Sequence, residues 1–220
     1  MYMAINEKRP PIKQSVGAQY ICFAKATEDG TFDGTFEEIV EKSEIVKSVK
    51  ISEQAESSKV MASGKPYVTS NLSSGTEIST EVVAFPADTL AKMRAETICT
   101  NGLMMSGSGN QRPFFAYGKV VLLDNGNYRF EWYPKCQLTA NTDDINTREE
   151  KFSEQNDTIT ILAYPYDDEG NINAYVDSTI KIPEGLSEEK FFAKPILTEK
   201  DLSDAVAVVA PVSNTKTEAK

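Results

Sequence analysis

Acidic side chains are the only residues of this chain that cluster densely enough to suggest a reaction. They gather at Asp143-Asp144, Glu149-Glu150 and Asp167-Asp168-Glu169. Two carboxylates facing each other across a cleft can hydrolyse a glycosidic bond, and several carboxylate oxygens together can bind calcium. All three groups lie in polar, turn-like segments, and the third lacks the alternating spacing and distal glutamate of an EF-hand loop. We interpret them as solvated turns.

Other catalytic devices are missing or incomplete in the sequence. The chain contains no histidine, which excludes a Ser-His-Asp triad and removes the commonest general base and transition-metal ligand. The glycine-rich segment 102–109 lacks the lysine of a P-loop, and we expect a mobile loop there. Cys22, Cys99 and Cys136 are far apart and form no CxxC pair, which favours buried, reduced thiols. We predict a protein that is not an enzyme and has no catalytic, cofactor-binding or metal-binding residues.

The charge balance limits the classes of partner. The chain of 220 residues carries 33 acidic and 23 basic side chains, a net charge of −10. Sequence-independent binding to nucleic acid or to an anionic membrane requires a basic surface, so both are disfavoured. No apolar run reaches the roughly 18 residues of a membrane-spanning helix. The first residues, MYMAINEKRPPIKQ, lack the apolar core of a signal peptide.

Alternating apolar and polar residues predict a chain dominated by strands. We expect strands over residues 20–26, 45–52, 77–85, 116–123, 128–133, 157–164 and 174–182, with the last two paired. Residues 36–47 fit a helix, a loop or a strand. Around the break Ser63-Gly64-Lys65-Pro66, the sequence allows two short strands or one long protruding hairpin.

Two helices are predicted. Thr89–Thr97 follows a Pro-Ala-Asp segment, with Asp88 as the N-cap and Leu90 and Met93 turned inward. Ser187–Phe192 is a short helix that Ser187 caps.

The strongest local signal is a hairpin. Ala116–Leu123 and Tyr128–Tyr133 flank the turn Asp124-Asn125-Gly126-Asn127, whose Asn-Gly pair favours the positive φ angles of a tight turn. We expect the second strand to end at Pro134 and its aromatic face, which includes Trp132, to lie in the core. The polar continuation 139–155 is too long for a simple turn, so we interpret it as a contact segment.

These patterns predict a mainly β protein, with an antiparallel β-sandwich or barrel-like core, one flanking α-helix, and extended terminal arms and loop. We expect residues 1–19 to form an N-terminal arm, 20–200 the domain, and 201–220 a flexible C-terminal tail. Glu77, Ser79 and Glu81 share the wet face of one strand. Such a polar face can line a channel when several copies close into a ring.

The order of several segments resembles a known family. YICFAKATEDGTF is followed by EIVKSVKIS, by EISTEVVAFPADTLAKMRAE and by the hairpin region, with its Tyr133-Pro134-Lys135-Cys136 corner and the segment Thr147-Arg148-Glu149-Glu150. This layout is similar to that of the major tail proteins of long-tailed, non-contractile phages, over roughly residues 15–182.

The resemblance implies a tail tube subunit with a β-sandwich core and Thr89–Thr97 as its flanking helix. Six copies would form a ring, stacked rings would form the tube, and four strands per copy would line the lumen. The two terminal arms and a long loop, here 52–74, would bridge neighbouring copies and rings.

The same resemblance implies the partners and the location. The tube would assemble in the bacterial host cytoplasm around a tape-measure protein, between tail terminator and distal tail proteins. It would then conduct DNA in the virion without specific binding. An acidic chain suits such a conduit, since basic contacts would retain DNA.

Two other functions remain as alternatives. One is a β-sandwich module that binds carbohydrate or protein on a phage or bacterial surface, for which Trp132 or Tyr133 would be exposed. The other is an enzyme that depends on Asp167 or Asp168.

Overall fold

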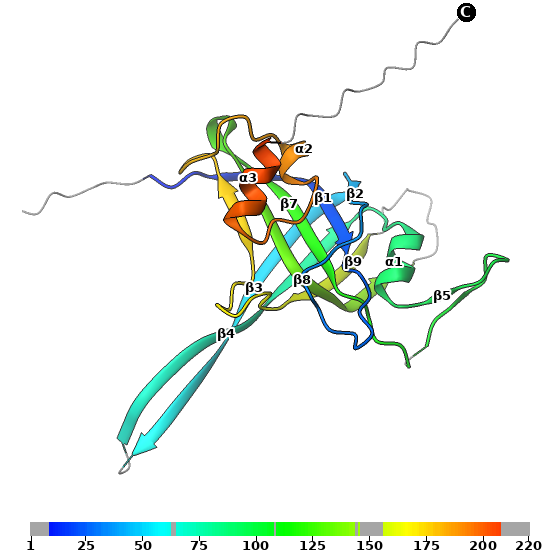
Figure 1. The fold of residues 1–220 in the computed structure, drawn as a ribbon, viewed down its shortest axis with the longest axis horizontal. Coiled ribbons are helices and arrows are strands. Elements are labelled where there is room, and N and C mark those ends of the chain that lie inside the picture. Colours follow the sequence, from blue (N-terminus) through cyan, green and yellow to red (C-terminus); the bar gives the residue numbers. More distant parts are fainter. Residues whose placement is uncertain (1–8, 63–64, 108, 144, 146–155, 208–220) are drawn as a thin grey trace, which may run out of the picture.

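The computed structural model describes residues 9–62, 65–107, 109–143, 145 and 156–207, with the backbone alone over 56–62 and 65–73. This part of the chain forms an eight-stranded antiparallel sheet, a separate two-stranded hairpin and a few short helices (Figure 1). The predicted mainly β, sandwich-like fold is therefore confirmed.

The elements follow one another in this order: β1 (Lys13–Phe23), β2 (Glu41–Ser43), β3 (Val46–Ala62), β4 (Lys65–Val82), α1 (Ala87–Met93), β5 (Thr97–Ile98), β6 (Met104–Met105), β7 (Phe115–Leu123), a 3-10 turn η1 (Asp124–Gly126), β8 (Tyr128–Asp143), β9 (Asp157–Ala163), β10 (Ala174–Asp177), α2 (Glu188–Phe191) and α3 (Glu199–Ala207). The strand order in the sheet is β2-β1-β7-β8-β9-β4-β3, and β10 pairs with β8.

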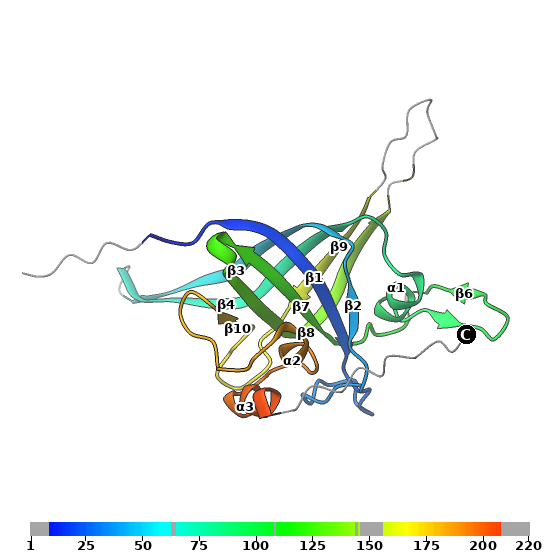
Figure 2. The same cartoon turned by 90° about the horizontal axis from the view of Figure 1, so that it is seen from above.

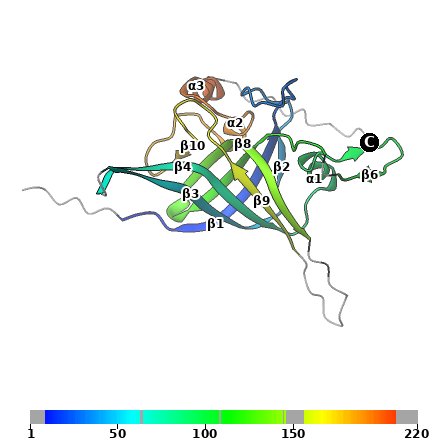
Figure 3. The ribbon, with the colours of Figure 1, turned by 90° about the horizontal axis from the view of Figure 1, so that it is seen from below.

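The sheet curves back on itself. Its two edge strands, β2 and β3, are consecutive in the chain and are separated only by Glu44 and Ile45, while β1 lies close to β3. Figure 2 and Figure 3 show this barrel-like curvature from above and below. The enclosed face holds a first core, which includes Ile78, Phe115, Tyr117 and Ile161.

A second core lies on the opposite face of β1, β7 and β8, where α2 and α3 cover the sheet and β10, which pairs with β8, contributes Val176. Trp132 is fully buried there and donates a hydrogen bond from Nε1 to the carbonyl oxygen of Phe191, at 3.2 Å. The rings of Tyr20 and Phe192 stack with centroids 3.9 Å apart. Because both faces of β7 and of the first half of β8 are covered, these strands are buried on both sides.

The predicted β7–β8 hairpin is confirmed, but its second strand does not end at Pro134. Asn125 and Gly126 adopt φ angles of 57° and 75° in the turn. Pro134 lies in a bulge, between the pairs Tyr117↔Tyr133 and Phe115↔Cys136. On its other side, β8 changes its neighbour from β10, up to Trp132, to β9, from Cys136 onward. A proline is tolerated there because it lies between two ladders.

Both predicted arms include residues that belong to helices or strands of the domain. β1 begins at Lys13 and pairs with β7 from that residue, so 13–19 belongs to the sheet. At the other end, α3 extends through Ala207, and Thr198 and Asp201 cap its first turn by exchanging hydrogen bonds. Leu202 packs against the second core. The remaining parts of the predicted arms, 1–8 and 208–220, lie outside the described residues.

Helix α1 differs from its prediction at both ends. It begins at Ala87 after Pro86, so Asp88 lies inside the first turn and does not cap it. It ends before Ala95, which has a φ of 55°. Met93 is fully buried as expected, whereas Leu90 is only partly buried. The predicted cap of α2 is confirmed, since Ser187 Oγ accepts a hydrogen bond from the Lys190 amide.

Three strand pairings correct or decide the remaining expectations. The long-hairpin alternative is correct, since β3 and β4 pair in register out to Ala62↔Lys65. β10 is shorter than predicted and pairs with β8, because β9 already lies between β8 and β4. The glycine-rich segment contributes β6 to a small hairpin with β5, so 102–109 is not entirely loop.

At Gly118 the aromatic rings of the second core pack directly against the sheet. A Cβ atom at this position would lie 2.9 Å from Phe192 Cε1 and from two Trp132 ring atoms. We expect Gly118→Ala to lower the free energy of unfolding by about 1–3 kcal/mol, because overpacking forces the rings apart. Urea denaturation measures this loss, with Gly107→Ala, where nothing lies within 4 Å, as the control. Equal stability of the two variants would contradict the packing described.

Candidate functional site

A polar surface covers the outer side of four neighbouring strands: β3, β4, β9 and the second half of β8. The registers of these strands place Glu77, Ser79 and Glu81 of β4 on the side opposite Ile78, Thr80 and Val82, which are buried in the first core. The neighbouring strands add residues to the same side. We call this surface the polar face: Ser48, Lys50, Ser52, Gln54, Glu77, Ser79, Glu81, Gln137, Ala140, Thr142, Thr158, Thr160 and Leu162.

Small hydroxyl and amide side chains dominate the polar face and hold its carboxylates. Glu81 accepts hydrogen bonds from Ser48 Oγ at 3.2 Å and from Asn156 Nδ2 at 2.9 Å. Glu77 accepts one from Gln54 Nε2 at 3.4 Å. Lys50 supplies a cation to this surface. The polar face therefore presents hydrogen-bonding groups and a slight excess of negative charge, without a basic cluster.

This four-stranded part has two open edges. On one side, β3 pairs only with β4 among the described strands. On the other, β7 stops pairing with β8 at Cys136, and Ala140 to Asp143 have β9 as their one partner in the described chain. Open edges present unpaired backbone groups and are sites where a second chain can add strands.

Arg112 marks where β8 loses β7 as its neighbour. Its guanidinium donates hydrogen bonds to the carbonyl oxygens of Leu138 and Thr139, at 2.7 and 2.9 Å. Gln137 Nε2 in turn donates to the carbonyl oxygen of Arg112, at 2.8 Å. The two guanidinium bonds occupy the carbonyl oxygens of Leu138 and Thr139, so the exposed edge of β8 begins at Ala140.

The β3–β4 hairpin extends this surface beyond the body of the molecule. β9 pairs with β4 only from Thr76 onward, so residues 55–62 and 65–73 continue past the sheet as a two-stranded ribbon (Figure 1). At about 3.3 Å per residue, the eight residues 55–62 reach roughly 25 Å. The segment predicted from the family resemblance as a bridging loop, 52–74, is this hairpin.

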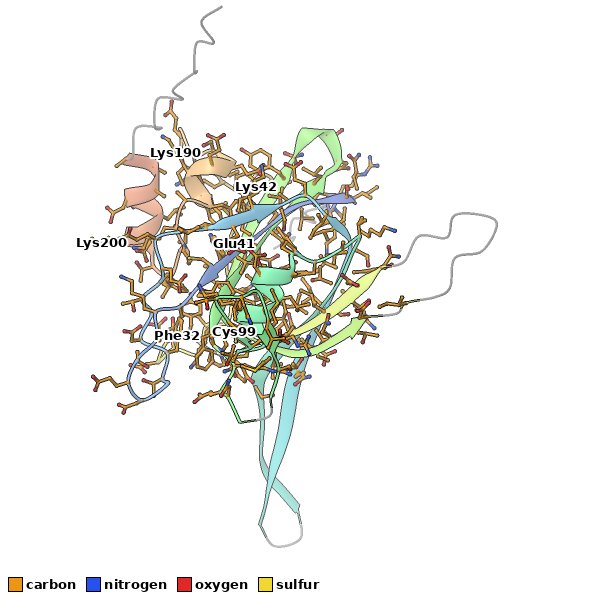
Figure 4. The ribbon with its side chains drawn as sticks, turned by 90° about the vertical axis from the view of Figure 1, so that its right-hand side faces the viewer. Phe32, Glu41, Lys42, Cys99, Lys190 and Lys200 are labelled. Carbon is orange, nitrogen blue, oxygen red and sulfur yellow. The ribbon has the colours of Figure 1, made fainter. Side chains whose placement is uncertain are left out.

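Helix α1 is fixed beside the sheet by polar contacts from the segment before β3. Thr89 Oγ1 donates a hydrogen bond at 2.5 Å to Glu41, which Figure 4 labels, and Lys92 pairs with Glu37 at 2.6 Å. The helix thus flanks the sheet, as predicted, next to the ends of β8 and β9.

The carboxylates that suggested chemistry are not brought together. Asp143 lies at one end of β9, opposite Asp157, whereas Asp167 follows the other end, roughly 20 Å away along the strand. Asp167 accepts hydrogen bonds from the backbone and side-chain nitrogens of Asn171, at 2.8 and 2.7 Å. Glu149 and Glu150 lie outside the described residues. In the part of the chain that is described, no three His, Cys, Asp or Glu residues are grouped as metal ligands.

The aromatic platform required by a binding module is absent at the two predicted positions. Trp132 is 0% and Tyr133 3% exposed, each in a different core. The expectation that this aromatic face belongs to the core is confirmed. Of the three thiols, Cys22 and Cys136 are buried as predicted, while Cys99 is partly exposed.

A buried ion pair on the enclosed face of the sheet was not predicted from the sequence. Lys119 and Glu131 lie opposite each other on β7 and β8, are 3% and 6% exposed, and form a salt bridge. Glu131 also accepts hydrogen bonds from the Tyr133 hydroxyl and from Asn173 Nδ2, at 3.2 and 3.0 Å. Burial lowers the pKa of Lys119, and the charge of Glu131 opposes that fall. Alternation placed these residues on one face, but only the fold closes that face.

Comparison with known proteins adds no relative: no protein-family model and no curated protein matches the chain. No helix in the described ranges is long and apolar enough to cross a lipid bilayer.

The Lys119–Glu131 pair yields a stability prediction. Glu131→Gln should lower the free energy of unfolding at neutral pH by about 3–5 kcal/mol, because it leaves an ammonium group buried without a counter-charge. The loss should shrink as pH rises, since the unfolded chain holds the Lys119 proton more strongly than the folded state and stability then increases with pH.

Chemical denaturation at several pH values measures this effect. Asp168→Asn, which removes one exposed negative charge, is the control. The double variant Lys119→Met/Glu131→Leu should regain most of the lost stability. If Glu131→Gln is as stable as the control, the pair does not have the role described.

Proposed function

We propose that this chain is a tail tube subunit of a long-tailed, non-contractile phage: a structural protein of the virion, not an enzyme. The observation that carries the proposal is the four-stranded polar face with an open edge on each side. The resemblance in segment order adds to it, because it implies four strands per copy along the lumen.

A ring of such subunits would place the polar face on its inner side. Four strands from each copy would then continue into four strands of the next, with the β3 edge of one copy against the β8 edge of its neighbour. Edge pairing of this kind removes unpaired backbone groups, which is the usual physical reason for a sheet to close. Six copies per ring is the number that the resemblance implies.

The chemistry of the polar face suits a conduit for DNA. Serine, threonine and glutamine side chains keep the surface wet, and Glu77 and Glu81 repel phosphate. Tight binding to DNA requires several basic contacts that release counterions, and the face supplies Lys50 alone among its members. A ring of six chains at −10 each would carry about −60, which further opposes retention of DNA.

Contacts between stacked rings would come from the β3–β4 hairpin and the termini. The hairpin reaches roughly 25 Å past Ala55 and offers two strand edges, enough to contact a neighbouring ring. A tape-measure protein inside the tube and terminator and distal tail proteins at its ends are the further partners that this function requires. Assembly would occur in the cytoplasm of the bacterial host.

The alternative, a carbohydrate- or protein-binding module, is less well supported. Its expected platform residues, Trp132 and Tyr133, are in the two cores, and no exposed aromatic cluster on the described sheet replaces them. The same sheet offers open edges, which favour self-assembly over binding of a small ligand.

Electron microscopy of the purified protein over a wide concentration range tests the proposal. We expect rings with six-fold symmetry, and tubes at high concentration, with a hollow centre. Sedimentation velocity should show the transition from monomer to assembly. A protein that stays monomeric at millimolar concentration, and that mass spectrometry never finds in virions, is not a tube subunit.

A shortened hairpin separates ring formation from stacking. Ala55 and Ser73 lie opposite each other, so an Asn-Gly turn can replace residues 56–72 without changing the register of the remaining strands. We expect this variant to form rings but to lose at least tenfold of its tube fraction in micrographs. Tubes of unchanged length would show that the hairpin does not connect rings.

A further inference from the structure

The small hairpin β5–β6 exposes an unusual amount of apolar surface. We call residues 97–105 the apolar hairpin. Its backbone is held by pairing of Ile98 with Met104, and by a hydrogen bond from the Cys99 amide to the Leu103 carbonyl at 2.8 Å. Ile98, Leu103, Met104 and Met105 have exposed fractions of 52%, 54%, 44% and 49%. The hairpin is therefore ordered but not packed against its own domain.

Composition points to an interaction. A quarter of the chain is charged, yet no charged residue occurs from Thr97 to Gln111. Contiguous exposed apolar side chains on a soluble domain usually mark a contact surface, and methionine adapts its shape to a partner. Solubility alone would favour the opposite composition in a protruding hairpin.

An apolar groove lies between β10 and α3. It has a volume of about 240 Å³, which accommodates a side chain of the size of methionine or leucine. Its walls include Tyr175, Val176, Phe191, Ile196 and Leu202, and Glu199 is the charged residue at its rim. Tyr175 is 52% exposed, and β10 pairs only with β8 among the described strands. The groove thus combines apolar walls with an open strand edge.

The apolar hairpin and the groove lie on different sides of the molecule. The hairpin extends beside α1, near the ends of β8 and β9, whereas β10 and α3 lie across the sheet from it (Figure 1, Figure 2). Figure 4 looks onto the side of the hairpin, with Cys99 labelled. Complementary surfaces on different sides of one chain produce head-to-tail contacts, which close into a ring when the rotation between copies allows it.

We propose that the apolar hairpin of one copy packs into the β10–α3 groove of the next copy. The inference rests on the proposed function in so far as the copies form a ring, and it names a second contact between neighbouring copies, besides the pairing of the β3 and β8 edges. A second copy of this chain is the occupant that fits, because both surfaces are almost free of charge. Two chains at −10 each repel elsewhere, and the repulsion is smallest where uncharged surfaces meet.

Each copy in a closed ring makes this contact twice, once with its hairpin and once with its groove. A contact of a few side chains is weak by itself, but ring closure makes the last contact intramolecular and strengthens the whole. Residues of the apolar hairpin should therefore matter far more for assembly than for folding.

Mixed cross-linking tests the contact directly. Chains with Met104→Cys are mixed with chains carrying Tyr175→Cys, both in a Cys99→Ser background, so that a disulfide between the two new thiols can form only between copies. We expect a disulfide-linked dimer at a yield several-fold above that of a control pair in which Ile39→Cys, at a 71% exposed position, replaces Met104→Cys. Equal yields would overturn the proposed contact.

An assembly measurement separates this inference from the tube function. Leu103→Glu should raise the protein concentration required for rings more than tenfold, while the urea unfolding midpoint stays that of the wild type. The control Ile39→Glu should change neither the concentration required for rings nor the unfolding midpoint. If Leu103→Glu assembles as the wild type does, this contact is wrong and the tube function stands. If the wild type forms no rings but the two cysteine variants give the mixed cross-link, the tube function is overturned and the contact is supported.

Discussion

The packing of Trp132 and Phe192 against Gly118 is the constraint on which the rest of the structure depends. The missing side chain at Gly118 lets two aromatic rings approach β7 closely, so the C-terminal segment with α2 covers one face of the sheet. The other face of the same strands encloses the first core. A sheet buried on both faces forms a rigid centre, and the strands that continue beyond it can remain open.

The open strands follow from this arrangement. β8 is long enough to leave the covered region at Pro134, change neighbours and continue beside β9 as an exposed strand. One strand thereby belongs to both the buried centre and the polar face. The four strands that carry the polar face are dry on their inner side and wet on their outer side, and their two outer edges have no neighbouring strand in the described chain. Open edges do not stabilise a monomer, whereas an assembly can pair them.

Local patterns predicted the elements whose signals are contained in short stretches. The Asn125-Gly126 turn, the inward Ile78, Thr80 and Val82, and the Ser187 cap all appear as predicted, because a turn, an alternation and a cap each depend on a few adjacent residues. Pro134 was misjudged because a bulge and a change of partner strand are nonlocal. Asp88 was misjudged because Pro86 starts the helix earlier. The β10 pairing could not be predicted, since a second strand competes for the same neighbour.

By itself, the sequence determined the mainly β class, the absence of histidine chemistry, the acidic balance and the polar side of Glu77, Ser79 and Glu81, because composition and alternation are properties of the chain alone. Only the tertiary structure decided which faces are covered. It buried Tyr133, joined Lys119 to Glu131, left the edges of β3 and β8 open, and set the apolar hairpin apart from the β10–α3 groove. Those features depend on contacts between residues far apart in the chain, and no local pattern encodes them.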